Sequence, residues 1–228
     1  MNPDSSQDKI SRVYRSKKEA ELAYNKMSRT YDLFAGIFES KYRYRTLKYL
    51  NIKTGENALE IGYGTGHSLE QMAKSAGETG RIYGIDISFG MLKVAEKRLK
   101  KVDLINRVEL KCGDAVTLPY QVDRFDAVFM SFTLELFDTP EIPIVLNEIK
   151  RVLKPGGRIG IVCMSKGNKP SGIVKLYEWV HQKFPKYADC RPIYVRQSVR
   201  DAGFNIQIQE TKKLFGLPIE IIICKPNL

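Results

Sequence analysis

Three glycines at alternate positions, Gly62, Gly64 and Gly66, offer the clearest chemistry in this chain. Glycine lets the backbone turn with positive φ and lie against a ligand with no side chain between them. An apolar run at residues 58–61 precedes the glycines, and a segment of helical character follows at residues 68–77. The start of such a helix offers N–H groups and a positive dipole end to an anionic group. The stretch therefore predicts a strand, a glycine turn and a helix that bind an anionic ligand.

The spacing of these glycines differs from the dinucleotide-binding fingerprint. That pattern, G-x-G-x-x-G, requires glycine where this chain has His67, and here an acid, Glu60, lies two residues before the first glycine. A second apolar run, residues 81–86, ends in Asp86. A carboxylate at that place can accept both hydroxyls of a ribose. The sequence thus favours a nucleoside ligand and disfavours a nicotinamide cofactor.

An ordered set of motifs resembles the class I S-adenosylmethionine (SAM)-dependent methyltransferases, most closely the ubiquinone/menaquinone-biosynthesis group. The set consists of Glu60-x-Gly62-x-Gly64-x-Gly66, Asp86, Cys112–Ala115, Phe125–Ser131 and Arg151–Gly157. The matching segments run from about Tyr24 to about Val162. The resemblance implies an α/β fold with a Rossmann-like, seven-stranded, mostly parallel sheet and helices on both faces. It also implies an antiparallel last strand, an N-terminal helical cap and an inserted lid helix.

The resemblance also implies a cofactor site for SAM. The three glycines would let backbone amides reach the methionine end, Asp86 would bind the ribose and Asp114 would accept the adenine amino group. Glu60 either orients the glycine turn or meets the methionine ammonium through water. His67 either contacts the methionine carboxylate or sits in the first turn of its helix. The remaining implied contacts are those of the adenine, with Ile87, Met91 and Ala115, and those of the methyl group, with Ser131 and Phe132.

Displacement of a methyl group from a sulfonium needs little chemical assistance from side chains, because the leaving group is already good. Alignment and exclusion of water can suffice, and a general base is needed only when the nucleophile must lose a proton. Glu135 is the first candidate base, and a carboxylate on a helix face is the alternative interpretation of it. Tyr31, in a Tyr-Asp pair that the resemblance places near the cofactor, and Asp138 are further candidates. Tyr31 could equally pack onto the main domain, and His181 is interpreted as a surface residue.

Motifs that mark methylation of nucleic-acid bases are absent after the strand predicted at residues 125–130, where the chain reads Met130–Thr133. We therefore expect a small-molecule or lipid-like acceptor, such as a quinol-type ring, and disfavour nucleic acid. Aromatic residues of the expected lid suit a ring or a prenyl tail, or form the core of the lid itself: Phe34, Phe38, Trp179 and Phe184. The alternatives are an RNA or protein methyltransferase that uses its basic flanks, and a SAM-binding module without catalysis.

The net charge of +11 is confined to the two flanks of the chain. Residues 51–164 carry 15 basic and 15 acidic side chains, residues 1–50 carry 11 and 6, and residues 165–228 carry 11 and 5. Such flanks suit an anionic acceptor, a peripheral contact with an anionic membrane, a nucleic acid, or simply a solvated surface. We expect neutral substitutions at Arg43 and Arg45 to alter the lid or a membrane contact more than cofactor affinity.

Composition predicts a cytoplasmic protein without a metal site. The four cysteines are widely spaced and form no C-x-x-C pair, which argues against zinc, and free thiols suit a reducing compartment. No run approaches the roughly 18 apolar residues of a membrane span. Residues 1–9 lack the apolar core of a signal peptide. No feature predicts an obligate protein partner.

The elements that must position these residues alternate along the chain. Strands are predicted at residues 57–61, 81–86, 107–112, 125–130 and 158–164, with helices at residues 68–77, 88–101 and 140–153. Such alternation implies right-handed βαβ units and a parallel sheet. Ser68 with Gln71 as a capping box, and Asp138 or Thr139 as a cap, are expected to open two of the helices.

The chain is expected to form one structural domain in three parts. Residues 1–50 form the N-terminal helical cap, and residues 51–164 form the SAM-binding core. The third part, residues 165–228, holds the lid insertion, a last helix at 194–203 and a terminal pair of strands at 204–210 and 219–224.

Overall fold

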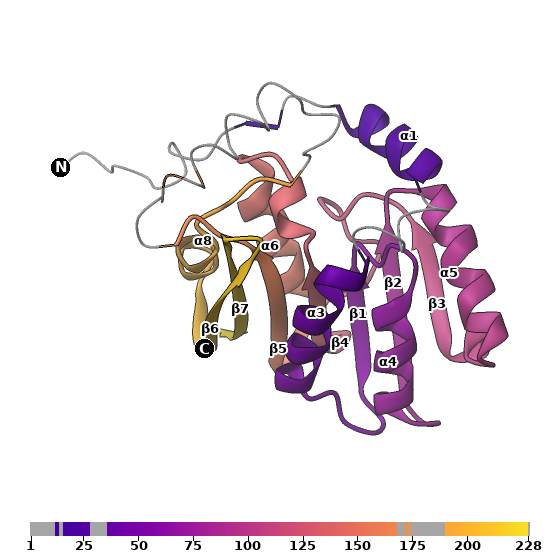
Figure 1. Cartoon of the computed structure of the whole chain (residues 1–228). Coiled ribbons are helices and arrows are strands. Elements are labelled where there is room, and N and C mark those ends of the chain that lie inside the picture. The colour runs from indigo at the N-terminus through magenta and orange to yellow at the C-terminus, as the bar shows by residue number, and fades with distance from the viewer. Residues whose placement is uncertain are drawn as a thin grey trace.

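A mixed sheet of seven strands lies at the centre of the part of the chain that the structure describes (Figure 1). The computed structural model describes residues 12–13, 16–27, 36–167, 172, 174 and 190–227, with only the backbone of Met27 and residues 36–38. The order of the strands is β3-β2-β1-β4-β5-β7-β6. This order, with helices on both faces, confirms the predicted Rossmann-like fold class.

Five parallel strands arise from the five apolar runs of the core. They are β1 (Asn57–Ile61), β2 (Arg81–Asp86), β3 (Val108–Cys112), β4 (Phe125–Ser131) and β5 (Leu153–Met164). Each pairs in parallel with its neighbours in this part of the sheet. The side chains of β1 and β4 are mostly buried, as expected for strands covered on both faces. β5 begins earlier than the predicted Arg158, because Leu153 already pairs with Phe125 ahead of an irregularity in the ladder.

The last two strands form a hairpin at one edge of the sheet. β6 (Phe204–Leu214) and β7 (Leu217–Pro226) are joined by Phe215 and Gly216, both of which have positive φ. β7 lies between β5 and β6 and runs antiparallel to both, which confirms the predicted antiparallel last strand. Both strands are longer than predicted. The sequence gives no apolar alternation for the end of β6, because this edge strand is largely exposed.

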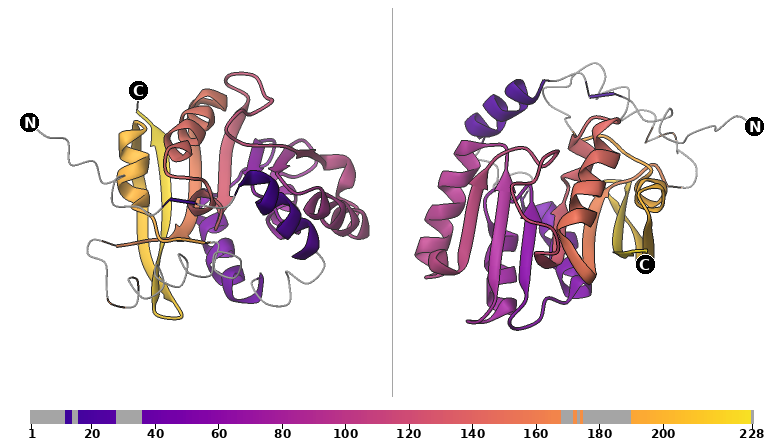
Figure 2. Two further views of the ribbon diagram at one scale, coloured as in Figure 1. Left: turned by 90° about the horizontal axis from the view of Figure 1, so that it is seen from above. Right: turned by 180° about the vertical axis from the view of Figure 1, so that it is seen from behind.

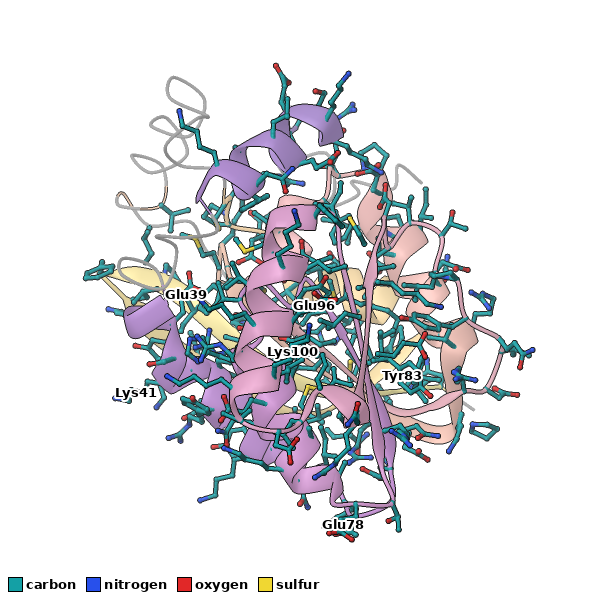
Figure 3. All side chains as sticks on the ribbon, turned by 90° about the vertical axis from the view of Figure 1, so that its right-hand side faces the viewer. Glu39, Lys41, Glu78, Tyr83, Glu96 and Lys100 are labelled. Carbon is teal, nitrogen blue, oxygen red and sulfur yellow. The ribbon has the colours of Figure 1, made fainter. Side chains whose placement is uncertain are left out.

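Helices cover both faces of the sheet (Figure 2). On one face, α4 (His67–Ala76) and α5 (Phe89–Lys101) bury their apolar side chains in a core that also contains Ile82. On the other, α6 (Glu141–Val152) and α8 (Val195–Asp201) pack over a core around Phe125. Glu96 and Lys100 lie on the side of α5 turned away from the sheet (Figure 3). Two short 3-10 helices precede β3 and follow β4, η2 (Ile105–Arg107) and η3 (Leu134–Leu136).

Two helices form the described part of the N-terminal cap. α3 (Gly36–Leu50) packs against β4, β5, β7 and α4, whereas α1 (Lys17–Met27) packs against α5. The predicted lid helix falls in residues 165–189, of which the structure describes only residues 165–167, 172 and 174. Among the helices of the described ranges, none has both the length and the apolar character needed to cross a bilayer.

The start of α4 differs from the prediction. The helix begins at His67, directly after Gly66 in the left-handed conformation, and no side chain caps it. Ser68 and Gln71 therefore do not form the predicted capping box. The Ser68 side chain is buried and stabilises the Glu60 carboxylate instead.

The start of α6 differs in a similar way. Pro140 occupies the cap position, and no side chain bonds to the helix start, so neither Asp138 nor Thr139 is the predicted cap. The Asp138 carboxylate accepts hydrogen bonds from the Arg12 guanidinium and the Val13 amide of the N-terminal segment. Asp138, which the local sequence predicts to cap the helix, thus makes a tertiary contact instead.

Candidate functional site

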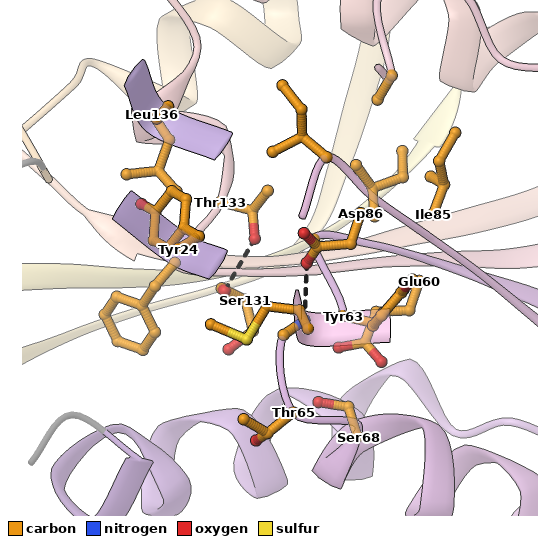
Figure 4. Close-up of a pocket in the computed structure, with 18 of the residues that line it drawn as sticks. Tyr24, Glu60, Tyr63, Thr65, Ser68, Ile85, Asp86, Ser131, Thr133 and Leu136 are labelled. Atoms are coloured by element: carbon orange, nitrogen blue, oxygen red, sulfur yellow. Dashed lines mark hydrogen bonds between the residues drawn. The ribbon is translucent and has the colours of Figure 1, made fainter. Parts of the chain in front are cut away.

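A pocket opens at the carboxyl ends of β1, β2 and β4, beneath α1 and beside α3 (Figure 4). It encloses about 1160 Å³, a volume that includes open solvent at its mouth. The structure brings together in its wall every predicted cofactor residue except Gly66: Glu60, Gly62, Gly64, His67, Asp86, Ile87, Met91, Asp114, Ala115, Ser131 and Phe132. The carboxyl edge of an open parallel sheet is where such folds bind ligands.

The glycine turn forms the floor of the pocket, but its amides are already bonded. The Gly62 amide donates to the Ile85 carbonyl at 2.8 Å, and the Gly66 amide donates to the Tyr63 carbonyl at 3.0 Å. The Gly64 amide donates to Asp86 Oδ2 at 2.9 Å. The glycines' own amides are therefore used within the protein, and the contact of other backbone amides of the turn with a methionine group stays a prediction. The glycines provide space and backbone conformation, and donors for an anionic group must come from other residues.

Gly62 and Gly66 leave no room for a side chain, for different steric reasons. A Cβ on Gly62, where φ is 71°, would lie 2.4 Å from Thr133 Cγ2. A Cβ on Gly66, where φ is 84°, would lie 3.0 Å from Ala95 Cβ. Gly66 thus lets α4 and α5 approach each other, which explains its place outside the pocket wall.

Asp86 is held rigidly at the end of β2. Its Oδ2 accepts the Gly64 amide and its Oδ1 accepts the Ser88 amide, both at 2.9 Å. Burial raises the pKa of Asp86 to about 6, although these two amides oppose the shift. Each carboxylate oxygen has a second lone pair, so the group can still accept hydroxyl donors from the pocket.

Glu60 lies in β1, just before the glycine turn, and lines the pocket. Its side chain is buried, and its Oε2 has no hydrogen-bond partner among the described residues. Burial raises the pKa of Glu60 to about 8, partly offset by the Ser68 hydroxyl and the positive charge of Arg43. A buried carboxyl group with a spare oxygen is suited to meet a cationic ligand.

Asp114 follows β3 and lines the pocket, as predicted for a residue of the adenine site. Its Oδ1 accepts the Val116 amide at 3.1 Å, and its Oδ2 pairs with Lys17 of α1. Lys17 also pairs with Glu141 Oε1 at 2.5 Å. The N-terminal helix therefore closes over this part of the pocket.

The end of β4 forms the part of the wall that is predicted to face the methyl group. Phe132 has a φ of 51°, and its amide donates to the Val162 carbonyl at 2.7 Å. The left-handed backbone is costly for an aromatic residue, so the sheet contact must hold it. The Ser131 hydroxyl oxygen is buried and has no hydrogen-bond partner in the described part of the chain.

The position of His67 is compatible with both of the alternatives considered for it. It is the first residue of α4, and it lines the pocket. Its contact with a ligand carboxylate stays a prediction.

The candidate bases do not gather in the pocket. Glu135 is fully buried outside the pocket wall, and its Oε1 accepts the Met164 amide at 3.0 Å. Burial raises the pKa of Glu135 to about 8. Although burial opposes the shift, the Arg12 guanidinium lowers the pKa of Asp138 to about 2, which disfavours a role as proton acceptor. Tyr31 and His181 lie outside the described residues, so the role of Tyr31 stays a prediction.

Among the residues of the wall that sequence reasoning did not predict are Lys17, Tyr24, Glu39, Arg43, Thr133, Leu136 and Phe137. The last three directly follow the predicted Ser131–Phe132 contact, so their nearness along the chain was an available signal. The other four come from α1 and α3, and no local pattern shows which face of these helices meets the sheet.

Three observations indicate that SAM fits these residues. A Cβ on Gly64 would meet nothing within 4 Å, so the turn presents a bare surface to the pocket. Glu60 Oε2 and Ser131 Oγ are buried polar atoms that have no partner among the described residues. Asp86 is oriented by two amides and keeps acceptor capacity for a sugar. Within the described ranges, no cluster of His, Cys, Asp and Glu could hold a metal ion.

Relatives with assigned functions match most of the chain. A demethylmenaquinone methyltransferase from Lactobacillus johnsonii is 37% identical over 151 residues, which cover 66% of this chain and 60% of that protein. One from Oceanobacillus iheyensis is 34% identical over 163 residues, covering 71% of this chain and 63% of that protein. The chain thus spans less than two thirds of the length of these relatives.

Solved structures agree on the fold. The [4+2]-cyclase SpnF matches with a TM-score of 0.75 at 18% identity, over 96% of this chain and 98% of that one. A SAM-dependent methyltransferase from Aquifex aeolicus matches with a TM-score of 0.60 at 24% identity, over 80% of this chain and 88% of that one. The model of the ubiE/COQ5 methyltransferase family matches residues 6–205. The chain belongs to the ubiE/COQ5 methyltransferase family.

Proposed function

We propose that this chain transfers the methyl group of SAM to a small or lipid-like acceptor with a quinol-type ring. The observation that carries the proposal is the apolar wall beside Ser131, formed by Phe132, Leu136 and Phe137. A flat, apolar ring can lie against such a wall next to the transferred group. The names of the curated relatives, demethylmenaquinone methyltransferases, support the same class of acceptor.

Catalysis in this proposal rests on alignment. The cofactor supplies a methyl group on a sulfonium, a good leaving group. Asp86 and Asp114, which line the pocket, would hold the two ends of the nucleoside, and the glycine turn would permit close approach of the backbone. Phe132 and Leu136 exclude water from the space in front of the methyl group. Orientation of the two reactants in a dry site lowers the barrier without a dedicated nucleophile on the protein.

The test is turnover with defined acceptors. The chain is incubated with SAM and, separately, a reduced demethylmenaquinone with a short prenyl tail, a reduced ubiquinone precursor, and total RNA. Mass spectrometry then measures methylated acceptor and S-adenosylhomocysteine (SAH). We expect methylation of a quinol and none of RNA.

Two outcomes would overturn the proposal. Methylation of RNA with no methylated quinol would support a nucleic-acid enzyme that uses the basic flanks. SAM binding with no turnover on any acceptor would support a binding module. Leu136→Ala, which changes the proposed acceptor wall, is assayed for turnover in the same way. Val122→Ala changes an exposed apolar residue and is its matched control.

A further inference from the structure

Arg43 of α3 lines the pocket, although sequence reasoning assigned it to the basic flank. Its side chain is half-buried, and its Nε is fully buried with no hydrogen-bond partner among the described residues. A guanidinium donor that is buried without a partner is costly, unless a ligand completes its bonding. The group therefore calls for an acceptor from the pocket.

Arg45, two positions further along the same helix, has the opposite environment. Residues two apart point to different sides of a helix. The Arg45 guanidinium pairs with Glu210 of β6, with Nη2 and Oε1 2.8 Å apart, and it is exposed. The structure therefore separates two residues that the sequence analysis treated together, since Arg43 lines the pocket and Arg45 does not.

The surroundings of Arg43 place it at the glycine turn. Its charge acts on Glu60, the buried acid beside that turn. Lys17, another cation of the pocket wall, is bonded to Asp114 and Glu141. A buried carboxyl group and a guanidinium thus lie within one pocket wall.

An amino-acid zwitterion requires such a pair. The three glycine amides are bonded within the protein, and the Leu69 amide stabilises the Glu60 carboxylate. These groups at the turn therefore leave a ligand carboxylate to be satisfied by other donors. A guanidinium binds carboxylate with strong, charge-assisted bonds.

We propose that Arg43 binds the carboxylate of the methionine moiety of SAM, while Glu60 meets its ammonium. The inference rests on the proposed function for the presence of SAM and adds a residue that positions it. Arg43 would thereby favour nucleosides that carry an amino-acid tail over nucleosides that lack it.

The test compares two ligands that differ in that tail. SAH carries the amino-acid group, whereas 5′-methylthioadenosine keeps the nucleoside and the thioether but lacks the tail. Isothermal calorimetry measures both affinities for wild type and for Arg43→Gln. We expect a loss of about 10- to 100-fold in SAH affinity, with methylthioadenosine affinity unchanged. Arg45→Gln is the matched control and should leave both affinities unchanged.

The outcomes separate this inference from the proposed function. An equal loss for both ligands, or no loss for either, would overturn the role of Arg43 while leaving SAM in place. Failure of wild type to bind either ligand would overturn the cofactor assignment itself.

A second measurement tests the proposal without the Arg43→Gln variant, in case that variant does not fold. Decarboxylated SAH keeps the ammonium but lacks the carboxylate, so wild type should bind it more weakly than SAH. Arg43→Lys should narrow that difference. Equal wild-type affinity for the two compounds would refute the proposal.

Discussion

Asp86 has two roles in the site, one in its backbone geometry and one in the predicted binding of ligand. Its carboxylate fixes the Gly64 and Ser88 amides and faces the pocket as the expected ribose acceptor. We expect Asp86→Asn to lower SAH affinity by about 10- to 100-fold, because an amide accepts at one oxygen and hydrogen bonds to a charged group are the stronger ones. Calorimetry measures the affinity, and thermal unfolding checks that the variant folds. Unchanged affinity would refute the ribose assignment.

Gly62 and Gly64 offer a matched pair with different neighbours. Gly62→Ala places a Cβ 2.4 Å from Thr133 Cγ2, whereas Gly64→Ala meets open space. We expect the free energy of unfolding to fall by about 2–4 kcal/mol for Gly62→Ala and by about 1 kcal/mol for Gly64→Ala. Thr133→Ala should rescue part of the first loss in the double variant. Additive losses in chemical denaturation would show that the Thr133 contact is not the cause.

Residue chemistry was predictable where a short motif carries it. Glu60, Asp86 and Asp114 stand at strand ends that the apolar runs define, so their place in the pocket followed from the sequence. The bonding of the glycine amides did not, because it depends on the neighbouring strand. The burial of Glu135 depends on β5, which supplies its Met164 partner.

At the scale of elements, α1 is attached to the core by side chains at both of its ends. Lys17 pairs with Asp114 and Glu141, and Asn25 Oδ1 accepts the Ser88 hydroxyl at 2.8 Å and the Gly90 amide at 2.6 Å. The helix therefore covers the pocket through contacts with strand ends and with the start of α5. Such contacts are partly exposed, so each one is weak.

We expect Lys17→Met to speed SAH dissociation by about 3- to 10-fold, because two partly exposed ion pairs that hold α1 over the pocket are lost. Stopped-flow displacement measures the rate. Lys18→Met changes an exposed lysine on the same helix and should have no effect. Slower or unchanged dissociation in Lys17→Met would contradict a covering role for α1.

The alternating strands and helices of the core could be predicted because each buries an apolar face. The placement of α1 and α3 could not, since their amphipathic pattern shows that they pack but not against what. Arg43 and Arg45 illustrate the limit. They are neighbours in sequence and alike in charge, yet one faces the pocket and the other faces β6.

At the scale of the molecule, buried acids set the dependence of stability on pH. Burial raises the pKa of both Glu60 and Glu135 to about 8 from an ordinary value of 4.5. The folded state therefore binds more protons than the unfolded state between these values, and stability falls as pH rises from about 5 to about 8. Asp86, with a pKa raised to about 6, acts in the same direction.

We expect Glu135→Gln to flatten this dependence, because its amide stays neutral and can still accept the Met164 amide. Melting temperatures measured between pH 5 and pH 8 should fall less than those of wild type. Glu78→Gln, at an exposed position beyond the end of α4, should follow wild type (Figure 3). Parallel curves for Glu135→Gln and wild type would show that Glu135 is not a source of the effect.

Contact of the basic flanks with an anionic membrane stays a prediction.

The position of β7 has a consequence during synthesis of the chain. Although β7 is the last strand in sequence, it lies inside the sheet, between β5 and β6. While the ribosome still holds residues 217–226, the edge of β5 has no partner, and β6 has nothing to pair with. The other part of the sheet, β1 to β4, can assemble earlier because domains form progressively as the chain emerges. Premature termination shortly before β7 would therefore leave a nascent chain with an open, apolar edge, which is a template for aggregation.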